Sequence, residues 1–293
     1  MRASPRVLYN TGEPNWNTPI IKLEPESGSH HCEVYAKLET VNPTGVHKDR
    51  ESAMVMLDMR RQGFTELACT STGNAAISIS AFASMNGFKS HVFVGEIPED
   101  KLELIRTFRP EIHKVKGGYF EALEAMRDYI AQKRVYNASA GCCPAKLDGN
   151  SYIGYEIARD LSPDYVICPT NNGTHFVGVG MGVKKAASRA KMVAAVAPRS
   201  VVAASITGFY GIEQPKIDTL IKETHGELVE VSDDELIMSS RSLAKQGVFA
   251  EPASAASVAA LLHIDSLRDS VVCCTITGSA LKYPLVMRDL LAY

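Results

Sequence analysis

The chain has 293 residues, of which 45% are apolar and 22% charged, and its formal net charge is −2. These values are ordinary for a globular enzyme with one large domain or two smaller ones. No basic stretch is interleaved with aromatic residues, so no nucleic-acid partner is expected. No segment approaches the roughly 20 apolar residues of a membrane span, so no membrane partner is expected. The N-terminus lacks the apolar run of a secretory signal, and we therefore expect a cytoplasmic protein.

Short apolar runs alternate with amphipathic stretches in the first part of the chain. This pattern predicts strands at residues 64–70, 89–94 and 112–116, and helices at residues 74–85, 100–108 and 120–132. A turn-rich stretch, Asn-Ala-Ser-Ala-Gly-Cys-Cys-Pro, follows at residues 137–144. We expect it to mark a boundary between two blocks of structure.

The second block repeats the alternation. It predicts strands at residues 165–168, 192–197 and 271–276, and helices at residues 177–187, 254–263 and 280–291. Alternating strands and helices favour an α/β fold with parallel sheets covered on both faces. We expect two open α/β/α domains with a cleft between them: a smaller one at residues 36–140, and a larger one at residues 1–35 and 141–293. Ligands of such sheets bind beyond the carboxyl ends of the strands.

One polar loop follows the first predicted strand and opens the next helix. It consists of Thr70, Ser71, Thr72, Gly73 and Asn74. Hydroxyls, a glycine and an amide at a helix N-terminus can bind an anion, and a substrate carboxylate would suit this site. Helix capping favours the same residue types, but it needs one such residue rather than five in a row. We therefore favour the binding role.

A second donor-rich loop follows the strand at residues 165–168. It contains Thr170, Asn171, Asn172, Gly173 and Thr174, and it could hold a phosphate at the next helix N-terminus. Glycines at alternate positions follow, which is also a feature of dinucleotide-binding loops. They lie a turn inside the helix, however, and the next strand ends without an acidic residue for a ribose. We therefore expect a phosphate site and no dinucleotide site.

Two further residues have more than one interpretation on local pattern alone. Thr277 ends the last predicted strand, where its hydroxyl could face a ring nitrogen or cap a helix. Lys48 lies in Asn-Pro-Thr-Gly-Val-His-Lys-Asp-Arg, residues 42–50, and an amine behind such a turn could form a Schiff base with an aldehyde. The charged residues 49–51 suit an exposed first helical turn. By spacing alone, Lys48 is a solvated charge.

The cysteines and histidines indicate no metal site. Four cysteines lie in apolar, strand-like runs and are expected to be small core residues: Cys69, Cys168, Cys273 and Cys274. No Cys-x-x-Cys pair occurs, and most of the eight histidines are scattered along the chain. A metal hydrolase is therefore a weak alternative.

Four ordered segments match a known set of motifs. They are Asn-Pro-Thr-Gly-Val-His-Lys-Asp-Arg at residues 42–50, Ser-Thr-Gly-Asn at 71–74, Glu-Pro-Ala-Ser-Ala-Ala-Ser at 251–257 and Thr-Gly-Ser-Ala-Leu-Lys at 277–282. A Thr-Pro-Ile opening stands at residues 18–20. In this order the segments resemble the pyridoxal-phosphate enzymes of fold type II, most closely the threonine synthases. The resemblance covers nearly the whole chain.

The resemblance implies pyridoxal 5′-phosphate as the cofactor and gives roles to single residues. Lys48 would form the Schiff base and move protons on the substrate. Asn74 would bond the 3′-oxygen of the cofactor, and Thr277 would face its ring nitrogen. The loop at residues 170–174 would bind the cofactor phosphate. Ser71, Thr72, Gly73 and the adjacent backbone would hold the substrate carboxylate.

The chain departs from the family pattern at three places. Val46 and His47 replace Ser-Phe before the lysine, and this Gly-x-His-Lys sequence is similar to tryptophan synthase β; His47 could touch the cofactor phosphate or simply pack. The phosphate loop Gly-Asn-Ala-Gly-Asn is Asn-Asn-Gly-Thr-His here, at residues 171–175. Lys146 replaces an arginine that helps to hold the substrate's phosphate in threonine synthase. It keeps the charge but loses the bidentate fork.

The resemblance leads to one main functional expectation and two alternatives. We expect a lyase or synthase that acts on an amino acid and converts O-phosphohomoserine and water to threonine and phosphate. The first alternative is β-elimination or β-replacement on serine, threonine, cysteine or O-phosphoserine. The second is a non-catalytic amino-acid sensor, against which the retention of Lys48 counts. The family also implies a homodimer.

Overall fold

A computed structural model describes residues 13–14, 16–24, 32–71, 73–96, 99–208, 211–283 and 288. The chain forms two compact units, one built on Lys48–Gly149 and the other on Asn17–His47 and the chain from Asn150 onward. The predicted smaller domain, residues 36–140, overlaps most of the first unit but begins and ends earlier in the sequence. Both units are α/β, as the alternation of strands and helices predicted.

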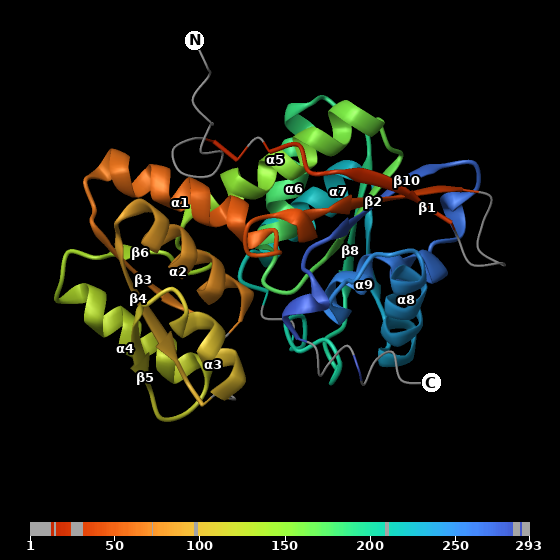
Figure 1. Cartoon of the computed structure of the whole chain (residues 1–293). Helices are drawn as coiled ribbons and strands as arrows, with labels where there is room; N and C mark the ends of the chain where they lie inside the picture. The colour runs from red at the N-terminus through yellow and green to blue at the C-terminus, as the bar shows by residue number, and fades with distance from the viewer. Residues whose placement is uncertain are drawn as a thin grey trace, which may run out of the picture. The chain divides into compact units, whose positions relative to one another are not determined.

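The first unit is a parallel four-stranded sheet in the order β5-β4-β3-β6 (Figure 1). Its strands are β3 (Glu66–Thr70), β4 (Lys89–Val94), β5 (Glu111–Lys114) and β6 (Tyr136–Asn137). Its helices are α1 (Lys48–Gln62), α2 (Asn74–Asn86), α3 (Glu99–Arg106) and α4 (Tyr119–Ala131). Ala68 and Phe93 on one face of the sheet pack against Ala122 and Met126 of α4. The strands and helices predicted between residues 64 and 132 are therefore confirmed.

The second unit holds a six-stranded sheet in the order β1-β2-β10-β7-β8-β9. The strands are β1 (Ile20–Leu23), β2 (Glu33–Leu38), β7 (Tyr165–Pro169), β8 (Lys191–Val196), β9 (Glu227–Glu230) and β10 (Val271–Ile276). β1 pairs antiparallel with β2, whereas the other strand pairs are parallel. This sheet therefore adds one antiparallel edge strand to the parallel arrangement that the sequence favoured, because β1 and β2 follow one another in sequence and need no crossover connection.

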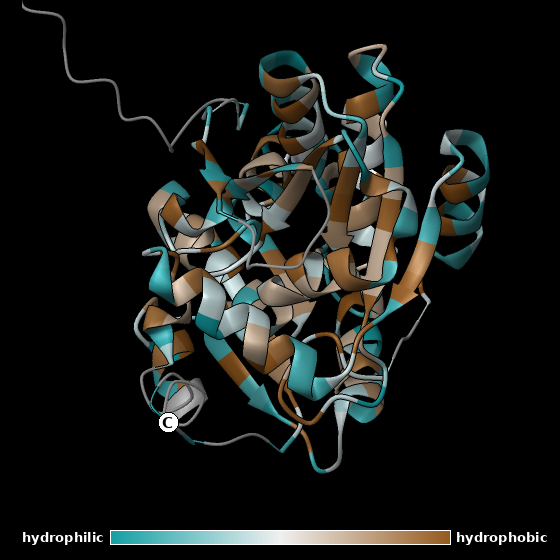
Figure 2. Cartoon of the chain, turned by 90° about the vertical axis from the view of Figure 1, so that its right-hand side faces the viewer, coloured by the Kyte–Doolittle hydropathy of each residue, from teal (hydrophilic) through white to brown (hydrophobic). Residues whose placement is uncertain are grey.

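The central strands of the second unit are buried on both faces, which explains their continuous apolar sequences. Figure 2 shows the hydrophobic colour concentrated on these strands and the hydrophilic colour on the outer helices. Cys168, Cys273 and Cys274 are buried there, and Cys69 is buried in the first unit, as predicted. Burial raises the pKa of the Cys168 thiol to about 12, so it remains an unreactive core residue.

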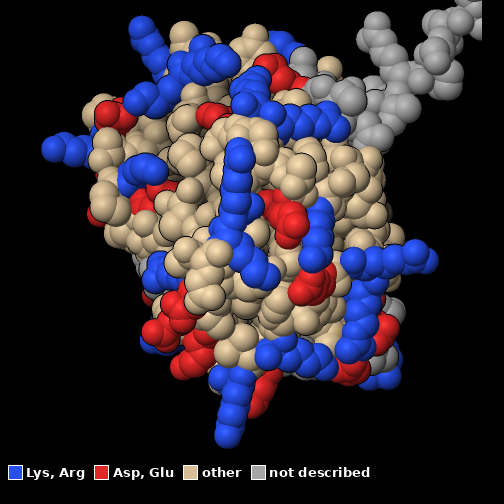
Figure 3. Space-filling model, turned by 90° about the vertical axis from the view of Figure 1, so that its left-hand side faces the viewer, with Lys and Arg blue, Asp and Glu red and all other residues tan. Residues whose placement is uncertain are grey.

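The C-terminal helices differ from the prediction. The predicted helix at residues 254–263 begins earlier, as α9 (Pro252–Ala259), and ends in a 3-10 turn at Ala260–His263. Of the helix predicted at residues 280–291, the structure describes a 3-10 turn at Ala280–Lys282 and a helical Arg288, and the rest lies outside the described residues. Within the described residues, no helix combines the length and apolar composition needed to cross a membrane. On the face drawn in Figure 3, cationic and anionic side chains are interspersed.

Glycines let two helices of the second unit approach at backbone distance. A Cβ on Gly154 of α5 (Pro144–Leu161) would overlap the Val179 carbonyl oxygen of α6 (Thr174–Lys185). A Cβ on Gly182 would overlap the Ser151 carbonyl oxygen in the reverse direction. The alternate glycines of α6 thus include packing residues, which supports the rejection of a dinucleotide loop.

Gly182→Ala should therefore destabilise the protein by about 1–3 kcal/mol, because α5 and α6 must separate to admit a methyl group. The helix propensity of alanine offsets part of this loss. The urea midpoint measures the effect. Met181→Ala is the matched control, because Met181 is the neighbouring exposed residue of α6. Equal midpoints for Gly182→Ala and the wild type would contradict this close packing.

Candidate active site

Lys48 is the first residue of α1, and its amine pairs with a buried carboxylate. The Lys48 Nζ lies 2.7 Å from Glu51 Oε1, while the side chains of the two residues are 18% and 3% exposed. A cation is disfavoured at a helix N-terminus, where the backbone N–H groups point outward. Glu51, one turn further on, compensates for this placement. The pair holds a half-buried amine in a defined position.

The first turn of α1 is buried, not exposed as its charges suggested. Asp49, Arg50 and Glu51 are each at most 2% exposed. The Arg50 guanidinium donates a hydrogen bond of 2.7 Å to the Pro14 carbonyl oxygen and lies 5.6 Å from the Trp16 ring. The charges mark a helix that begins inside the unit and is anchored there. The prediction of a solvated first turn was wrong because sequence shows charge but not its partners.

Neighbouring helices fix the backbone that carries Lys48. Ser52 of α1 and Ser78 of α2 share a buried hydrogen bond of 2.7 Å. A Cβ on Gly149 of α5 would overlap the Arg50 carbonyl oxygen. The start of α1 is therefore held by α2 on one side and by α5 on another.

The polar loop of the first unit connects β3 to α2, as predicted. Gly73 is the N-cap residue and provides no side-chain cap, and its N–H donates to Ser71 Oγ at 3.3 Å. Asn74 is the first residue of α2. Thr72, predicted to bind substrate, lies outside the described residues. Because the N-cap residue contributes no oxygen, the helix end can serve an anion.

Lys146 belongs to the same unit and is buried, with 7% exposure. Burial raises the pKa of the Cys69 thiol to about 11, and the charge of Lys146 opposes that rise. Cys69 directly precedes Thr70 at the carboxyl end of β3. The Lys146 ammonium therefore acts on the strand end that leads into the polar loop. The polar loop and one buried cation therefore belong to the same unit.

The second predicted loop leads into α6 in the second unit. Gly173 is the N-cap residue, with φ of 91°, and a Cβ there would lie 2.6 Å from Ile217 Cδ1. The left-handed conformation and this contact both require glycine. Asn172 Oδ1 accepts a hydrogen bond of 3.0 Å from the Thr174 N–H.

The side chains in this loop do not all serve the same role. Thr170 donates to the Cys168 carbonyl oxygen at 2.9 Å, and Asn171 donates to the Ser205 carbonyl oxygen at 3.0 Å. The Thr174 hydroxyl is buried and has no hydrogen-bond partner among the residues that the structure describes. A buried hydroxyl without a partner at a helix N-terminus fits a bound phosphate. The side chains of Thr170 and Asn171 act mainly on the protein itself.

Other motifs meet in the second unit. The His47 N–H donates to the Thr277 carbonyl oxygen at 2.8 Å, and the Thr277 and Ser254 hydroxyls lie 2.8 Å apart. The His47 and His175 rings are 4.4 Å apart. The segment before Lys48, the end of β10 and the start of α9 are thus joined. Either predicted role of His47, packing or phosphate contact, remains compatible with this position.

His175 was missed as a site residue in the sequence. It is buried, and its ring nitrogens lie 3.1 Å from Asn150 Oδ1 and 3.0 Å from Thr275 Oγ1. These contacts fix the second residue of α6 against α5 and β10. Its position directly after the donor-rich loop was the only signal in the sequence. His175 therefore fixes the start of α6, directly after the loop that was predicted to bind phosphate.

Each unit carries groups that suit pyridoxal phosphate: the first has an amine for its aldehyde, and the second has a hydroxyl for its ring nitrogen and a helix N-terminus for its phosphate. Thr174→Val should weaken cofactor binding by about 10- to 100-fold, the loss of one charge-assisted hydrogen bond. The apoenzyme should stay as stable or become more stable, because a buried hydroxyl without a partner is removed. Cofactor titration and apoenzyme melting measure the two effects.

Thr219→Val is the control for Thr174→Val, because the Thr219 hydroxyl donates within α7 (Gln214–Thr224) to the Pro215 carbonyl oxygen. It should leave cofactor affinity unchanged. Unchanged affinity in Thr174→Val as well would show that this hydroxyl does not contact the phosphate.

Comparisons with known proteins agree with this fit. The family model described as "Pyridoxal-phosphate dependent enzyme" matches residues 13–278. Threonine synthase of Bacillus sp. (strain ULM1) is 30% identical over 92% of this chain and 84% of its own length. Threonine synthase of Methanocaldococcus jannaschii is 28% identical over 91% of this chain and 75% of its own.

Solved structures show the same fold at lower identity. Maize serine racemase has a TM-score of 0.83 and 15% identity, covering 94% of this chain and 91% of that one. O-ureido-L-serine synthase has a TM-score of 0.78 and 22% identity, covering 91% of this chain and 90% of that one. The extent of the family match and the relatives together show that the chain belongs to the pyridoxal-phosphate-dependent enzymes of fold type II and is a lyase similar to threonine synthase.

Proposed function

We propose that the chain converts O-phosphohomoserine and water to threonine and phosphate. The observation that carries the proposal is the buried Lys146 ammonium, whose charge acts on the end of β3 that leads into the polar loop. A substrate with a carboxylate and a phosphate needs two anion sites. The N-terminus of α2 supplies one and Lys146 the other. The threonine synthases among the relatives support the same choice of substrate.

Lys48, Glu51 and Thr174 have separate roles in the proposed reaction. When bound at Lys48, pyridoxal phosphate supplies an electron sink that stabilises negative charge on the substrate's carbon skeleton. Lys48 Nζ takes and returns protons at the α- and β-carbons, since it is the amine on the anchored first turn of α1. Glu51 accepts a hydrogen bond from Lys48 Nζ and keeps it oriented. The α6 N-terminus, with Thr174, holds the cofactor phosphate.

Ser71, Gly73 and Asn74 orient the substrate carboxylate at the N-terminus of α2, and Lys146 balances the charge of the substrate phosphate. The Thr277 hydroxyl, a neutral group that lies 2.8 Å from the Ser254 hydroxyl, would face the ring nitrogen. A neutral hydroxyl there would leave that nitrogen unprotonated, which would suit elimination and replacement. A homodimer and a cytoplasmic location remain predictions.

Steady-state assays with O-phosphohomoserine, serine and threonine test the proposal. We expect phosphate and threonine from the first substrate and little ketoacid from the others. Lys146→Ala should raise the KM for O-phosphohomoserine by about 10-fold or more, and Lys146→Arg should recover most of it. Lys116→Ala, which removes an exposed cation of the same unit, is the matched control.

Ketoacid from serine or threonine without phosphate release from O-phosphohomoserine would replace the proposal with the β-elimination or β-replacement alternative. A protein that binds amino acids but turns over none would favour the sensor. Normal turnover of O-phosphohomoserine by Lys146→Ala would remove the role of Lys146 while keeping the substrate.

A further inference from the structure

A cluster of histidines and carboxylates crosses three strands of the first unit, on the sheet face that α4 covers. In the parallel register, Ala68 pairs with His91 and His91 pairs with Glu111. Glu66 lies two residues before Ala68, and His113 lies two residues after Glu111, so all these side chains project from one face. The Tyr129 ring of α4 covers it, 4.9 Å from the His91 ring.

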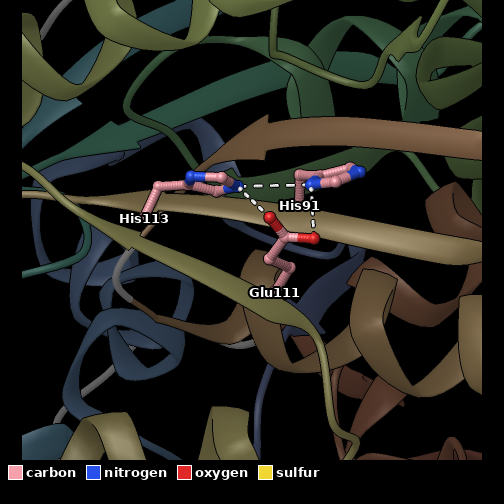
Figure 4. Close-up of side chains that lie close together, drawn as sticks. All are labelled: His91, Glu111 and His113. Carbon is pink, nitrogen blue, oxygen red and sulfur yellow. Dashed lines mark hydrogen bonds and ion pairs between the residues drawn. The ribbon is translucent and has the colours of Figure 1, made fainter.

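Three side chains of this cluster bring one ligand atom each within 4.8 Å of one another. His91 Nδ1 lies 3.2 Å from His113 Nε2, and the two oxygens of Glu111 lie 3.6 Å from those nitrogens, one from each (Figure 4). A tetrahedral Zn²⁺ with bonds of about 2.0–2.1 Å holds its ligand atoms about 3.3–3.4 Å apart. Each nitrogen is near that separation from one Glu111 oxygen, so the carboxylate needs only to turn to bring one oxygen toward both nitrogens.

Glu66 orients the central histidine for metal binding. Its Oε2 lies 2.8 Å from His91 Nε2, on the opposite side of the ring from Nδ1. A carboxylate at this distance accepts a hydrogen bond from the Nε2–H group, and in that tautomer Nδ1 carries a lone pair on the side of His113 and Glu111. Histidines that bind metals are held by this kind of carboxylate contact. Two histidines that only share a hydrogen bond with each other would not need a carboxylate on the far side of one ring.

The site is open to solvent on one side. His91 is buried, while the side chains of His113 and Glu111 are 24% and 45% exposed, so an ion can enter along β5. The fourth position falls to water or to the Tyr129 hydroxyl, 3.2 Å from His91 Nδ1.

Two lysines face the cluster and weaken its attraction for cations. Lys89 Nζ pairs with Glu111 Oε2 at 2.7 Å, and Lys133 Nζ lies 3.1 Å from the Tyr129 hydroxyl. The carboxylates of Glu66 and Glu111 offset these two charges. Binding a divalent ion therefore requires Lys89 to release Glu111. This competition gives a specific test.

We propose that His91, Glu111 and His113 bind a divalent transition-metal ion, with Zn²⁺ fitting the ligand set best. The ion would join the edge strand β5 to β4 and so stabilise that border of the sheet. The expectation of no metal site rested on two features of the sequence, the lack of Cys-x-x-Cys pairs and the scattered positions of the histidines, and neither feature reports on these residues. Here the ligands come from adjacent strands, and their proximity follows from register alone.

The test uses the holoenzyme, stripped of metal with a chelator while pyridoxal phosphate is kept bound. Zn²⁺ is titrated in competition with a chromophoric chelator, and Co²⁺ absorption reports the geometry. We expect one Zn²⁺ per chain and a tetrahedral Co²⁺ spectrum without a thiolate charge-transfer band. His113→Gln should weaken the affinity for Zn²⁺ by more than about 100-fold, and Glu66→Gln should weaken it by about 10- to 100-fold. Lys89→Gln should tighten it.

His263→Gln is the matched control, since His263 also contacts a carboxylate, Glu235, at 2.8 Å, but lies in the other unit. It should bind Zn²⁺ like the wild type. Equal Zn²⁺ affinity in the wild type and His113→Gln would overturn the proposal, and so would a cobalt–thiolate band that His113→Gln leaves unchanged. Because His113 is only half-buried, its variant should fold, and an unchanged cofactor spectrum checks this independently of the proposed reaction.

Discussion

Lys48→Ala should lower turnover of O-phosphohomoserine by at least about 10³-fold, within the range of positioned acid–base groups. The variant loses both the amine that links the cofactor and the group that moves protons. Borohydride reduction followed by peptide mass measurement should place the cofactor on Lys48 in the wild type and nowhere in the variant. The melting temperature should also fall, because the Glu51 carboxylate, whose side chain is 3% exposed, loses the cation that it pairs with.

Two further variants separate the chemistry of Lys48 from its charge. Lys48→Arg keeps a cation beside Glu51 but cannot form the Schiff base, so it should be as inactive as Lys48→Ala. Glu51→Gln keeps the shape of the carboxylate and should retain the reduced adduct while losing turnover and changing the pH profile. Reduction of the cofactor onto Lys146, with activity retained in Lys48→Ala, would show that the assignment of Lys48 is wrong.

The fold was predictable wherever the sequence pattern had a single physical cause. Strands β7, β8 and β10 are buried on both faces, so they read as continuous apolar runs between turn residues. The eighteen-residue helix α5 was missed because its glycines, at positions 149 and 154, look like turn signals. They are there because other backbone segments pass within contact distance, a tertiary cause that local pattern cannot show.

The site was predictable to a different degree. Loops that follow strands were found because anion binding demands clustered hydroxyls, amides and glycines at helix N-termini. The burial of Glu51 against Lys48 was not found, since it depends on where α1 enters the unit. The cluster of His91, Glu111 and His113 was missed for a related reason. Adjacent strands bring together residues about twenty positions apart, and only the register of the sheet specifies which ones meet.

The largest stability effect should come from the buried ion pair of the second unit. Lys37 Nζ lies 2.6 Å from Glu156 Oε2, and both side chains are 0% exposed. Lys37 also donates to the Thr18 carbonyl oxygen at 2.7 Å. Lys37→Met leaves the Glu156 carboxylate buried without its cation, which should cost about 3–5 kcal/mol. For a unit of this size the melting temperature should fall by about 6–20 °C.

Two controls decide whether that loss comes from the stranded charge. The double variant Lys37→Met with Glu156→Leu removes both charges and should recover most of the stability, because a buried apolar pair avoids the desolvation cost. Lys22→Met breaks the exposed pair with Glu33, which solvent screens, and should leave the melting temperature almost unchanged. If the double variant were no more stable than Lys37→Met, the loss would instead reflect packing around β2. Recovery, by contrast, would show that the pair adds little net stability, because each charge mainly offsets the desolvation cost of the other.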